Sequence, residues 1–495
     1  MSSVLPPSDL VLRLRDGFVE AGYTIDGVRE RLGEVAATAL AREETVPALR
    51  ATRDGDPLAT LIRLWWLGAR VDASDLAAAG LPVDGLAEAG LIVRRGDTVH
   101  AGVHLQPWDT GEGDPAWVVS DRKVRPGDPA LRPDHVVGAG GASANLAQLG
   151  AGGPVGRALD LGTGCGVQVL HLAGRAEEIV ATDVNGRALE LARLSWMLSG
   201  VSGVDAREGS LFDPVHGETF DLVVSNPPFV ISPAGRFSYR ESGFQGDDFC
   251  RDLVRRTPRH LDQDGHGRFL ANWLHVKGED WRDRVGGWLT ETGCDGWAVQ
   301  RDVQDPAEYV ELWLRDSAEQ GTTAYRERYD EWLAWFESLD VTGIGFGWIA
   351  LHNSGSTDPV VRVEELTHRV ELPVGEYVGD VLGAIGAAHR ISDEDLLDAY
   401  LTLAEGVVEE RSGVPGAEDP SRIALRQTRG LRRTAAVGTV EAALAGACDG
   451  DLPVRPLLAA IAELIDADAG ELLERAPGTL RTLVAEGFLA VANTR

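Results

Sequence analysis

Short apolar runs alternate with helix-like stretches through the middle of the chain, and this alternation predicts the core of the fold. We expect strands over Ala158–Leu161, Ile179–Asp183, Asp205–Glu208, Leu222–Ser225, Arg268–Trp273, Trp297–Val303 and Gly345–His352. Most of them are followed by apolar residues at helical spacing, over Val167–Leu172, Arg187–Leu198, Phe249–His260, Trp281–Glu291 and Pro306–Ala318. Such alternation predicts an α/β fold with a parallel, doubly wound sheet, whose ligands lie at the carboxyl ends of the strands.

The first hundred residues have a different pattern, in which helices precede a hairpin. Apolar residues recur at helical spacing in Leu58–Leu67, and Asp75–Ala79 predicts a short helix. Arg94–Asp97 predicts a turn between two short strands, Leu91–Val93 and Val99–Leu105. This order is typical of a winged-helix-like unit, here over residues 1–105. Residues 106–130, rich in Pro, Gly and Asp, predict a connector, and the alternating segment then covers 131–355.

The N-terminal pattern returns in the last part of the chain, residues 365–495. Val454–Leu464 and Ala469–Glu474 predict helices, and an apolar strand follows. The segments Leu86-Ala-Glu-Ala-Gly-Leu-Ile and Leu483-Val-Ala-Glu-Gly-Phe-Leu are alike. Two interpretations stay open: a second winged-helix-like unit, or a glycine that simply caps a helix before a strand. Winged helices bind nucleic acid or protein, so this fold alone would not decide the function.

Charge and cysteine content narrow the class of protein. The 495 residues carry a net charge of −30, and residues 1–115, 116–370 and 371–495 contribute −7, −13 and −10. No segment is basic as a whole, as a protein that mainly grips phosphate backbones would be. The four cysteines lie far apart, no apolar run reaches membrane-spanning length, and the first ten residues lack a signal-peptide pattern. We therefore expect a reduced, cytoplasmic protein without a membrane partner.

A glycine-rich turn follows the first expected strand of the middle segment. In Leu159-Asp-Leu-Gly-Thr-Gly-Cys-Gly166, the glycines at 162, 164 and 166 permit a tight strand-to-helix turn and close approach of a ligand. The second strand ends at Asp183, whose carboxylate is placed to accept both hydroxyls of an adenosine ribose. A glycine turn alone has a structural explanation, but this combination predicts a nucleoside-containing cofactor.

The spacing of the glycines favours one cofactor over another. Dinucleotide sites use Gly-x-Gly-x-x-Gly, and here the third glycine, Gly166, comes one residue too early. Asp160 precedes the loop, where its carboxylate suits a sulfonium or amino group better than a pyrophosphate. S-adenosylmethionine is therefore a better candidate than NAD.

These motifs, in this order, resemble class I S-adenosylmethionine-dependent methyltransferases of the small-domain group. The resemblance rests on Asp160–Gly166, Asp183, Gly209–Asp213 and Asp221-Leu-Val-Val-Ser-Asn-Pro-Pro-Phe229, and covers about residues 130–350. The group includes release-factor glutamine methyltransferases and ribosomal-RNA guanine-N2 and adenine-N6 enzymes, and the layout is similar to an actinobacterial branch. The resemblance implies a seven-stranded Rossmann-like domain, with Ser210 or Leu211 beside the adenine ring.

Asn226-Pro-Pro-Phe229 is the most specific part of the resemblance. The substrate nitrogen of such enzymes shares its lone pair with a carbonyl or ring and is a poor nucleophile. The Asn226 side-chain oxygen and the Pro227 carbonyl can accept its two N–H groups and so orient it. Phe229 offers a flat face on which a planar amide or base stacks. The prolines hold the turn, and catalysis is mostly positioning.

The sequence leaves the substrate open between two kinds of macromolecule. Acidic charge in every segment favours a glutamine-type amide of a protein, whereas the two possible winged helices favour an exocyclic amine of a nucleobase in RNA or other nucleic acid. We lean slightly to protein. A third interpretation, a non-catalytic cofactor-binding regulatory protein, would be expected to lose Asn226 or the glycines, and this chain keeps them.

Three other features carry weaker hypotheses. The loop Gly138–Ser143 covers the methionine end of the cofactor or merely caps a helix. Two groups of arginines contact an anionic substrate or RNA, or else lie on solvated faces and pair with nearby acids: Arg251, Arg255, Arg256 and Arg259, and Arg429, Arg432 and Arg433. The eleven histidines show no metal-ligand spacing, so we expect no metal site.

Overall fold

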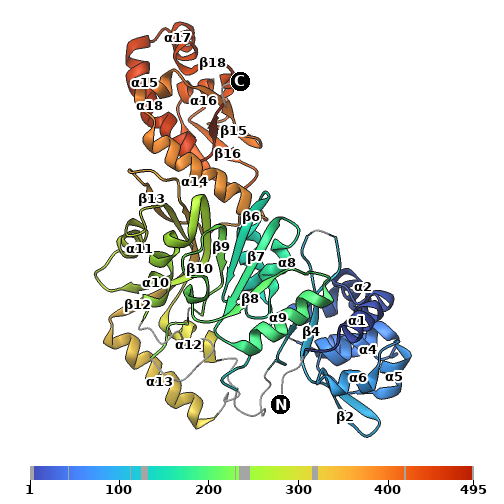
Figure 1. Ribbon diagram of the computed structural model, residues 1–495. Helices are drawn as coiled ribbons and strands as arrows, with labels where there is room; N and C mark the ends of the chain where they lie inside the picture. Colours follow the sequence, from blue (N-terminus) through green and yellow to red (C-terminus); the bar gives the residue numbers. More distant parts are fainter. Residues whose placement is uncertain are drawn as a thin grey trace.

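The computed structural model describes residues 5–42, 44–111, 113–123, 132–228, 230–233, 246–314, 322–416 and 420–492. A large sheet forms the centre, with smaller units beside it and beyond one edge (Figure 1). No helix in the described ranges is long and apolar enough to cross a membrane. The same ranges contain no cluster of three or more His, Cys, Asp or Glu side chains that would hold a metal ion.

The central sheet has eight strands in the order β13-β11-β12-β10-β9-β6-β7-β8. Their bounds are β6 (Val155–Leu161), β7 (Ala176–Asp183), β8 (Asp205–Glu208), β9 (Phe220–Ser225), β10 (Leu261–Val276), β11 (Asp295–Gln304), β12 (Val341–His352) and β13 (Val361–Glu365). Five neighbours, from β8 to β10, run parallel. β12 is antiparallel to both β10 and β11, and β13 is parallel to β11.

The sequence predicted seven strands, all parallel, and on both points the sheet differs. It has an eighth strand, β13, and it is mixed because β12 runs the other way. The reason lies in the connection after β11. Two helices, α12 (Pro306–Leu314) and α13 (Thr323–Ser338), follow β11 and pack on each other, so β12 starts from the edge where β11 ended. It therefore returns in the opposite direction.

Helices cover both faces of the sheet. One face packs against α7 (Gly141–Gly150), α8 (Val167–Leu172), α9 (Gly186–Leu198) and α14 (Gly375–Arg390). The other face packs against α10 (Asp248–Arg256) and α11 (Trp281–Thr290) through buried aromatic residues such as Trp273 and Trp281. The inner strands β6 and β9 are mostly apolar and buried because both faces of the sheet are covered.

The N-terminal unit joins this core through a shared hydrophobic cluster. It contains α1 (Ser8–Ala21), α2 (Ile25–Ala41), α3 (Val46–Ala51), α4 (Pro57–Leu61), α5 (Ala73–Ala78), α6 (Val83–Glu88) and a sheet of β1 (Val71–Asp72), β3 (Thr98–Ala101) and β2 (Ile92–Arg95), in that order. A hairpin of β4 (His104–Trp108) and β5 (Ala116–Ser120) follows, mostly within the segment 106–130 that was predicted as a connector. Its second strand lies along α9, where the Val119 N–H donates to Ser195 Oγ (2.9 Å). The strand expected over Val99–Leu105 is divided between β3 and β4.

The C-terminal unit repeats the sheet arrangement of the N-terminal unit in another chain order. Its elements are α15 (Asp393–Leu397), β14 (Tyr400–Leu403), β15 (Val407–Ser412), β16 (Arg422–Gln427), β17 (Thr434–Val437), α16 (Thr439–Ala447), β18 (Asp449–Pro453), α17 (Val454–Leu464), α18 (Ala469–Ala485) and β19 (Leu489–Val491). The sheet order is β18-β14-β19, all antiparallel, as in β1-β3-β2. In the N-terminal sheet the central strand, β3, is the last of the three strands along the chain, whereas in the C-terminal sheet the central strand, β14, is the first.

The two similar sequence segments occupy the same place in these units. Each ends a helix with a left-handed glycine, Gly90 (φ 73°) and Gly487 (φ 74°). In both, the residue after the glycine donates its N–H back into the helix, from Leu91 to the Leu86 carbonyl (3.0 Å) and from Phe488 to the Leu483 carbonyl (2.8 Å). This is the hydrogen bonding of a glycine helix cap. The repeated sequence therefore does form a glycine helix cap in each unit, and the two units also contain sheets of the same strand arrangement.

The C-terminal unit lies at the amino edge of the central sheet (Figure 1). α14 begins beside the start of β6, where Val374 N–H donates to the Gln148 carbonyl, and ends where Arg390 pairs with Asp295 at the start of β11 (3.1 Å). α18 packs on α14 from the far side. Arg433 of the C-terminal unit donates to both carboxylate oxygens of Glu364 on β13.

The Glu364–Arg433 pair generates a stability prediction. Both side chains are largely buried, at 17% and 8% exposed, and the arginine lowers the pKa of Glu364 below its ordinary 4.5. Glu364→Gln leaves a buried guanidinium unpaired and should destabilise the protein at pH 7 by about 3 kcal/mol. A lowered carboxyl pKa gives stability above pH 4.5 that is lost as the pH falls through the folded-state value. Thermal unfolding from pH 8 to pH 3.5 should therefore show the wild type converging on the variant below pH 4.5.

Glu394→Gln is the matched control, because its arginine pair with Arg455 is exposed (81% at the glutamate). It should leave the unfolding midpoint nearly unchanged at every pH. An equal loss of stability in both variants would contradict the role assigned to Glu364.

Candidate active site

Four parallel strands end side by side at the carboxyl edge of the central sheet. β6 lies between β9 and β7, so the chain leaves β6 at the point where the strand order reverses. Ligands of open α/β sheets bind in the crevice at such a point. The structure brings together the strand ends that carry Asp160, Asp183, Glu208 and Ser225.

The glycine loop after β6 adopts the conformation that the sequence predicted. Gly162, Gly164 and Gly166 have φ angles of 74°, 56° and 82°, in the left-handed region that favours glycine. A Cβ at Gly166 would lie 2.5 Å from Trp196 Nε1, so this glycine allows α9 to approach the loop. Cβ atoms at Gly162 and Gly164 would meet nothing within 4 Å. The loop therefore presents open space to a ligand at those two positions.

Asp183 holds the neighbouring loops in place. Its Oδ2 accepts the Gly164 N–H and its Oδ1 accepts the Asn185 N–H, each at 2.8 Å. Its main-chain carbonyl accepts the Gly209 N–H from the end of β8 (2.9 Å). Burial raises the pKa of the Asp183 carboxyl. Each carboxylate oxygen keeps further acceptor capacity, which a pair of ribose hydroxyls would use.

Asp160 is almost completely buried, with 1% of its surface exposed. Thr163 Oγ1 donates to Asp160 Oδ2 at 2.6 Å. Burial, with a smaller contribution from Asp183, raises the pKa of Asp160 to about 7. A buried carboxyl of this kind would be stabilised in its ionised form by a nearby cation. The carboxylates of Asp160 and Asp183 thus fit a cofactor that has a positive group next to an adenosine.

Ser210 and Leu211 follow β8 on the same edge. Ser210 is exposed and Leu211 is half-buried. Leu211 has a φ of 47°, a left-handed conformation that is uncommon for a leucine. The chain therefore turns at this residue and does not continue in the direction of β8. Both residues lie next to the loop that Asp183 holds, where the resemblance places the adenine ring.

Asn226 and Pro227 begin the loop after β9. Ser225 Oγ donates to the Leu161 carbonyl (2.7 Å), which ties the end of β9 to the end of β6. Pro227 is buried, whereas Asn226 is half-buried, and its side chain has no hydrogen-bond partner within the described residues. Phe229 lies outside the described residues, and its stacking role stays a prediction.

The remaining sequence hypotheses have mixed outcomes. Gly141 is the first residue of α7 and Gly140 precedes it, so the Gly138–Ser143 loop does begin a helix. Arg433 is buried against Glu364 and so neither contacts RNA nor lies on a solvated helix face. Arg251 and Arg255 pair with Glu291, and Arg256 pairs with Asp213 and Asp252.

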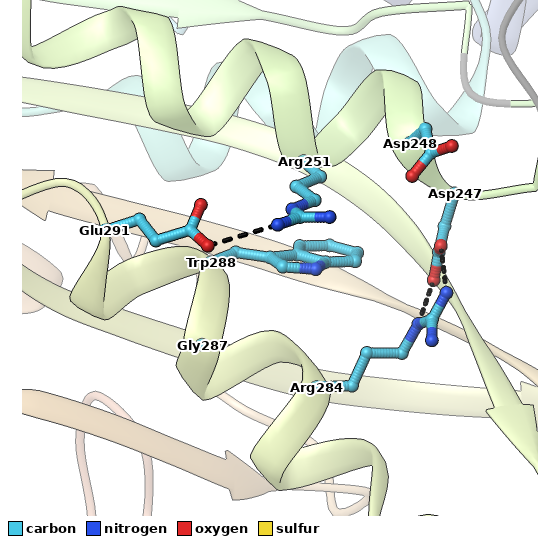
Figure 2. A pocket seen from close by; sticks show the side chains of 7 residues that line it. All are labelled: Asp247, Asp248, Arg251, Arg284, Gly287, Trp288 and Glu291. Carbon is cyan, nitrogen blue, oxygen red and sulfur yellow. Dashed lines mark hydrogen bonds and ion pairs between the residues drawn. The ribbon is translucent and has the colours of Figure 1, made fainter.

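The pocket between α10 and α11 in Figure 2 belongs to this arginine group. It has a volume of about 200 Å³ and is lined by Trp288 and by paired charges. Asp247, the residue before α10, accepts two guanidinium N–H groups of Arg284 on α11 (2.8 and 2.7 Å) and the Leu274 N–H (2.9 Å). These pairs hold α10 and α11 on the sheet.

Sequence reasoning missed some polar residues that organise this edge. Thr163 stands inside the glycine motif, and its hydroxyl at the end of a buried strand was a usable signal. Asp121 pairs with Arg187 (2.6 Å) and accepts the Val136 N–H, which brings residues 132–139 to the start of α9. Nothing in the sequence pattern indicated that long-range contact.

Two family models match parts of the chain. Residues 141–276 match the methyltransferase small domain. The central sheet is thus a methyltransferase Rossmann-like fold. Residues 20–102 match a domain of unknown function, DUF7059, which covers most of the N-terminal unit.

Curated relatives of the methyltransferase domain fall into two groups. A release factor glutamine methyltransferase of Xylella fastidiosa is 33% identical over 167 residues, which cover 31% of this chain and 53% of the relative. A ribosomal RNA small subunit methyltransferase C of Salmonella arizonae is 33% identical over 120 residues, 24% of this chain and 31% of the relative. The chain thus spans about half or less of the length of these relatives. Among solved structures, a ribosomal protein L11 methylase from Lactobacillus delbrueckii subsp. bulgaricus covers 31% of this chain and 68% of its own, with 21% identity and a TM-score of 0.23.

The open glycine loop predicts that Gly164→Ala weakens cofactor binding. The added methyl would project into the open space of the loop, and alanine is strained there by roughly 1 kcal/mol. Titration calorimetry with S-adenosylmethionine should show at least a tenfold loss of affinity.

Gly96→Ala provides the control. Gly96 has a similar φ of 63° and equally open space, but lies in the β2–β3 turn, far along the chain from the loop. It should lose similar stability and keep full affinity. If Gly164→Ala also binds normally, the loop does not face the cofactor.

The raised pKa of Asp160 predicts pH-dependent cofactor binding. Below pH 7 the carboxyl is mostly protonated, and a cation must displace that proton, whereas above pH 7 the carboxylate is already present. Affinity for S-adenosylmethionine should therefore rise by up to about tenfold between pH 6 and pH 8. Calorimetry in buffers of different ionisation enthalpy should detect proton release near pH 6.5. Asp160→Asn should abolish both effects, and a flat wild-type profile would contradict the assignment.

Proposed function

We propose that this protein is an S-adenosylmethionine-dependent N-methyltransferase that acts on a planar nitrogen. The observation that carries the proposal is Asn226, half-buried and without a hydrogen-bond partner among the described residues, beside an open glycine loop on the same sheet edge. The match to the methyltransferase small domain over residues 141–276 supports it. The four cysteines are buried and free, which fits a reduced, cytoplasmic location.

The residues of the loop have separate roles in this proposal. S-adenosylmethionine, when bound, supplies an electrophilic methyl group. Gly162 and Gly164 leave room for it, Asp160 faces its positive charge, and Asp183 accepts the ribose hydroxyls. Ser210 and Leu211 border the adenine. Asn226 Oδ1 and the Pro227 carbonyl accept the N–H groups of the substrate, and Phe229 stacks on its plane. Orientation of the nitrogen lone pair is the main source of the rate enhancement.

The charge of the protein favours a protein amide as the substrate. The elements that would form a reading helix in the N-terminal unit, α5 and α6, carry Asp75, Asp84 and Glu88 and no basic residue. Arg94 on the adjacent strand β2 pairs with Asp84 (3.0 Å). Phosphate backbones require a positive surface. A glutamine-type amide is therefore our first candidate. The relatives that act on ribosomal RNA, by their names, keep an exocyclic base amine as the second.

The same proposal extends to the organisation of the chain. We assign residues 1–105 and 365–495 to winged-helix-like units, 106–130 to the connecting segment and 131–355 to the catalytic domain, which β13 extends by one strand. The similar sheet orders of the terminal units and their matching glycine caps support a common type. The actinobacterial branch stays a prediction.

Tritium transfer tests the activity and the substrate together. The full-length protein should transfer label from methyl-tritiated S-adenosylmethionine into protein when it is incubated with a lysate of a bacterial strain that lacks its gene. Protease should release the counts, and ribonuclease should leave them unchanged. Counts in the RNA fraction would replace the amide with a nucleobase amine, and no transfer to either would contradict the proposal.

Asn226 variants separate chemistry from binding in this assay. Asn226→Ala should lower turnover at least a hundredfold, because a positioned acceptor of this kind contributes about 10²–10³ in rate. Asn226→Asp keeps an oxygen acceptor and should retain more activity than the alanine variant. Both should bind S-adenosylmethionine within twofold of wild type by calorimetry. Full turnover by Asn226→Ala would rule out the orientation mechanism.

A further inference from the structure

Three buried polar groups meet just behind the Asn226 loop. The Ile231 N–H donates to Tyr309 Oη at 2.9 Å, and Asn272 Nδ2 lies 3.4 Å from the same oxygen. The exposed fractions of the three residues are only 2%, 1% and 0% for Ile231, Asn272 and Tyr309. A buried main-chain N–H requires a partner, and here a side chain 78 residues further along the chain provides it.

The three groups come from three different elements of the carboxyl edge. Ile231 lies five residues after Asn226, in the loop that follows β9. Asn272 lies on β10, three residues beyond Phe269, which pairs with Ser225 at the end of β9. Tyr309 lies in the first half of α12, which follows β11. Sheet topology therefore brings all three beside the loop that carries the proposed acceptors.

Packing fixes the tyrosine from its other side. Tyr309 belongs to an aromatic and aliphatic cluster between the loop, the sheet and the two helices α12 and α13, with Val230, Ile231, Leu274, Val310, Leu314, Trp332, Phe336, Val341 and Ile344. Phe336 and Phe346 contact its ring at centroid distances of 6.0 and 5.7 Å. Because the ring is held on several sides, its hydroxyl has a defined position.

We propose that Tyr309 is a positioning residue for the Asn226 loop, and that the α12–α13 pair thereby sets the geometry of methyl transfer. The proposal rests on the proposed function for its catalytic consequence, but the contact itself does not. Tyr309 touches no reacting atom. It holds the Ile231 amide, so the stretch that begins with Asn226 is fixed at both ends: by Ser225 on Leu161, and by Ile231 on Tyr309. A shift of about 1 Å in a positioned acceptor costs a large part of an enzyme's rate.

Burial raises the pKa of the Tyr309 hydroxyl far above neutrality. The hydroxyl therefore stays neutral at any working pH, and its effect on the loop is independent of pH. This separates Tyr309 from Asp160, whose ionisation changes near pH 7.

Tyr309→Phe tests the contact, since it keeps the ring and removes only the oxygen. Tyr329→Phe is the matched control: Tyr329 lies on α13, and its hydroxyl contacts Glu311 and the Ala307 carbonyl of α12, not the loop. Hydrogen–deuterium exchange, with electron-transfer fragmentation to resolve single amides, should show the Ile231 amide exchanging at least tenfold faster in Tyr309→Phe. The same amide should be unchanged in Tyr329→Phe, and amides of β12 should be unchanged in both.

Turnover and binding complete the test. With the substrate fraction that accepts tritium from the wild type, Tyr309→Phe should lower kcat at least tenfold, with KM and the calorimetric affinity for S-adenosylmethionine within twofold. An unchanged Ile231 amide would overturn the proposal, as would faster exchange with normal kcat. Faster exchange throughout the chain would also overturn it, by making Tyr309 a general stability residue. Absence of transfer by the wild type would contradict the proposed function alone, because the exchange result does not depend on activity.

Discussion

The Asp183 carboxylate accepts main-chain N–H groups from two loops, at Gly164 and at Asn185, and the geometry of the whole sheet edge depends on these bonds. The neighbouring Thr182 carbonyl accepts the N–H groups of Gly162 and Thr163, and the Asp183 carbonyl accepts that of Gly209. A two-residue stretch at the end of β7 thus holds the loops after β6 and β8 and the start of α9. The main-chain N–H groups of Gly162, Thr163, Gly164 and Gly209 are thus bonded before a ligand binds, which preorganises these loops.

Much of the central sheet could be predicted because its inner strands, such as β6 and β9, are buried on both faces and therefore read as apolar runs. The strand expected at Asp205–Glu208 and the helix expected at Val167–Leu172 have those bounds in the structure. The direction of β12 could not be predicted, since an apolar run is the same in a parallel and an antiparallel strand. The strand expected over Val99–Leu105 includes only His104 and Leu105 of the β4–β5 hairpin. The rest of the hairpin was missed because it lies among prolines, glycines and acids, and its order comes from packing on α9.

The candidate site divides in a similar way. Asp160, the three glycines, Asp183 and Asn226 were predicted as site residues because each lies at the end of a predicted strand, and the structure does gather these strand ends at one edge. Tyr309, Asn272 and Ile231 form contacts between residues far apart in sequence, which no local pattern encodes. Arg433 shows that a local cluster can also mislead. Three nearby arginines suggested an exposed basic surface, but Arg433 is buried because it pairs with Glu364, 69 residues earlier in the chain.

The position of α14 sets a length scale for the partners of this protein. α14 runs along the amino edge of the sheet and carries the C-terminal unit there, while the candidate site lies at the other edge. A strand such as β6, seven residues long, separates the two edges by about 20–25 Å. A single side chain or base cannot bridge that separation. Any molecule that contacts the C-terminal unit and the candidate site at the same time must therefore follow the outside of the domain from one edge to the other, so its length as well as its chemistry decides whether it can do so.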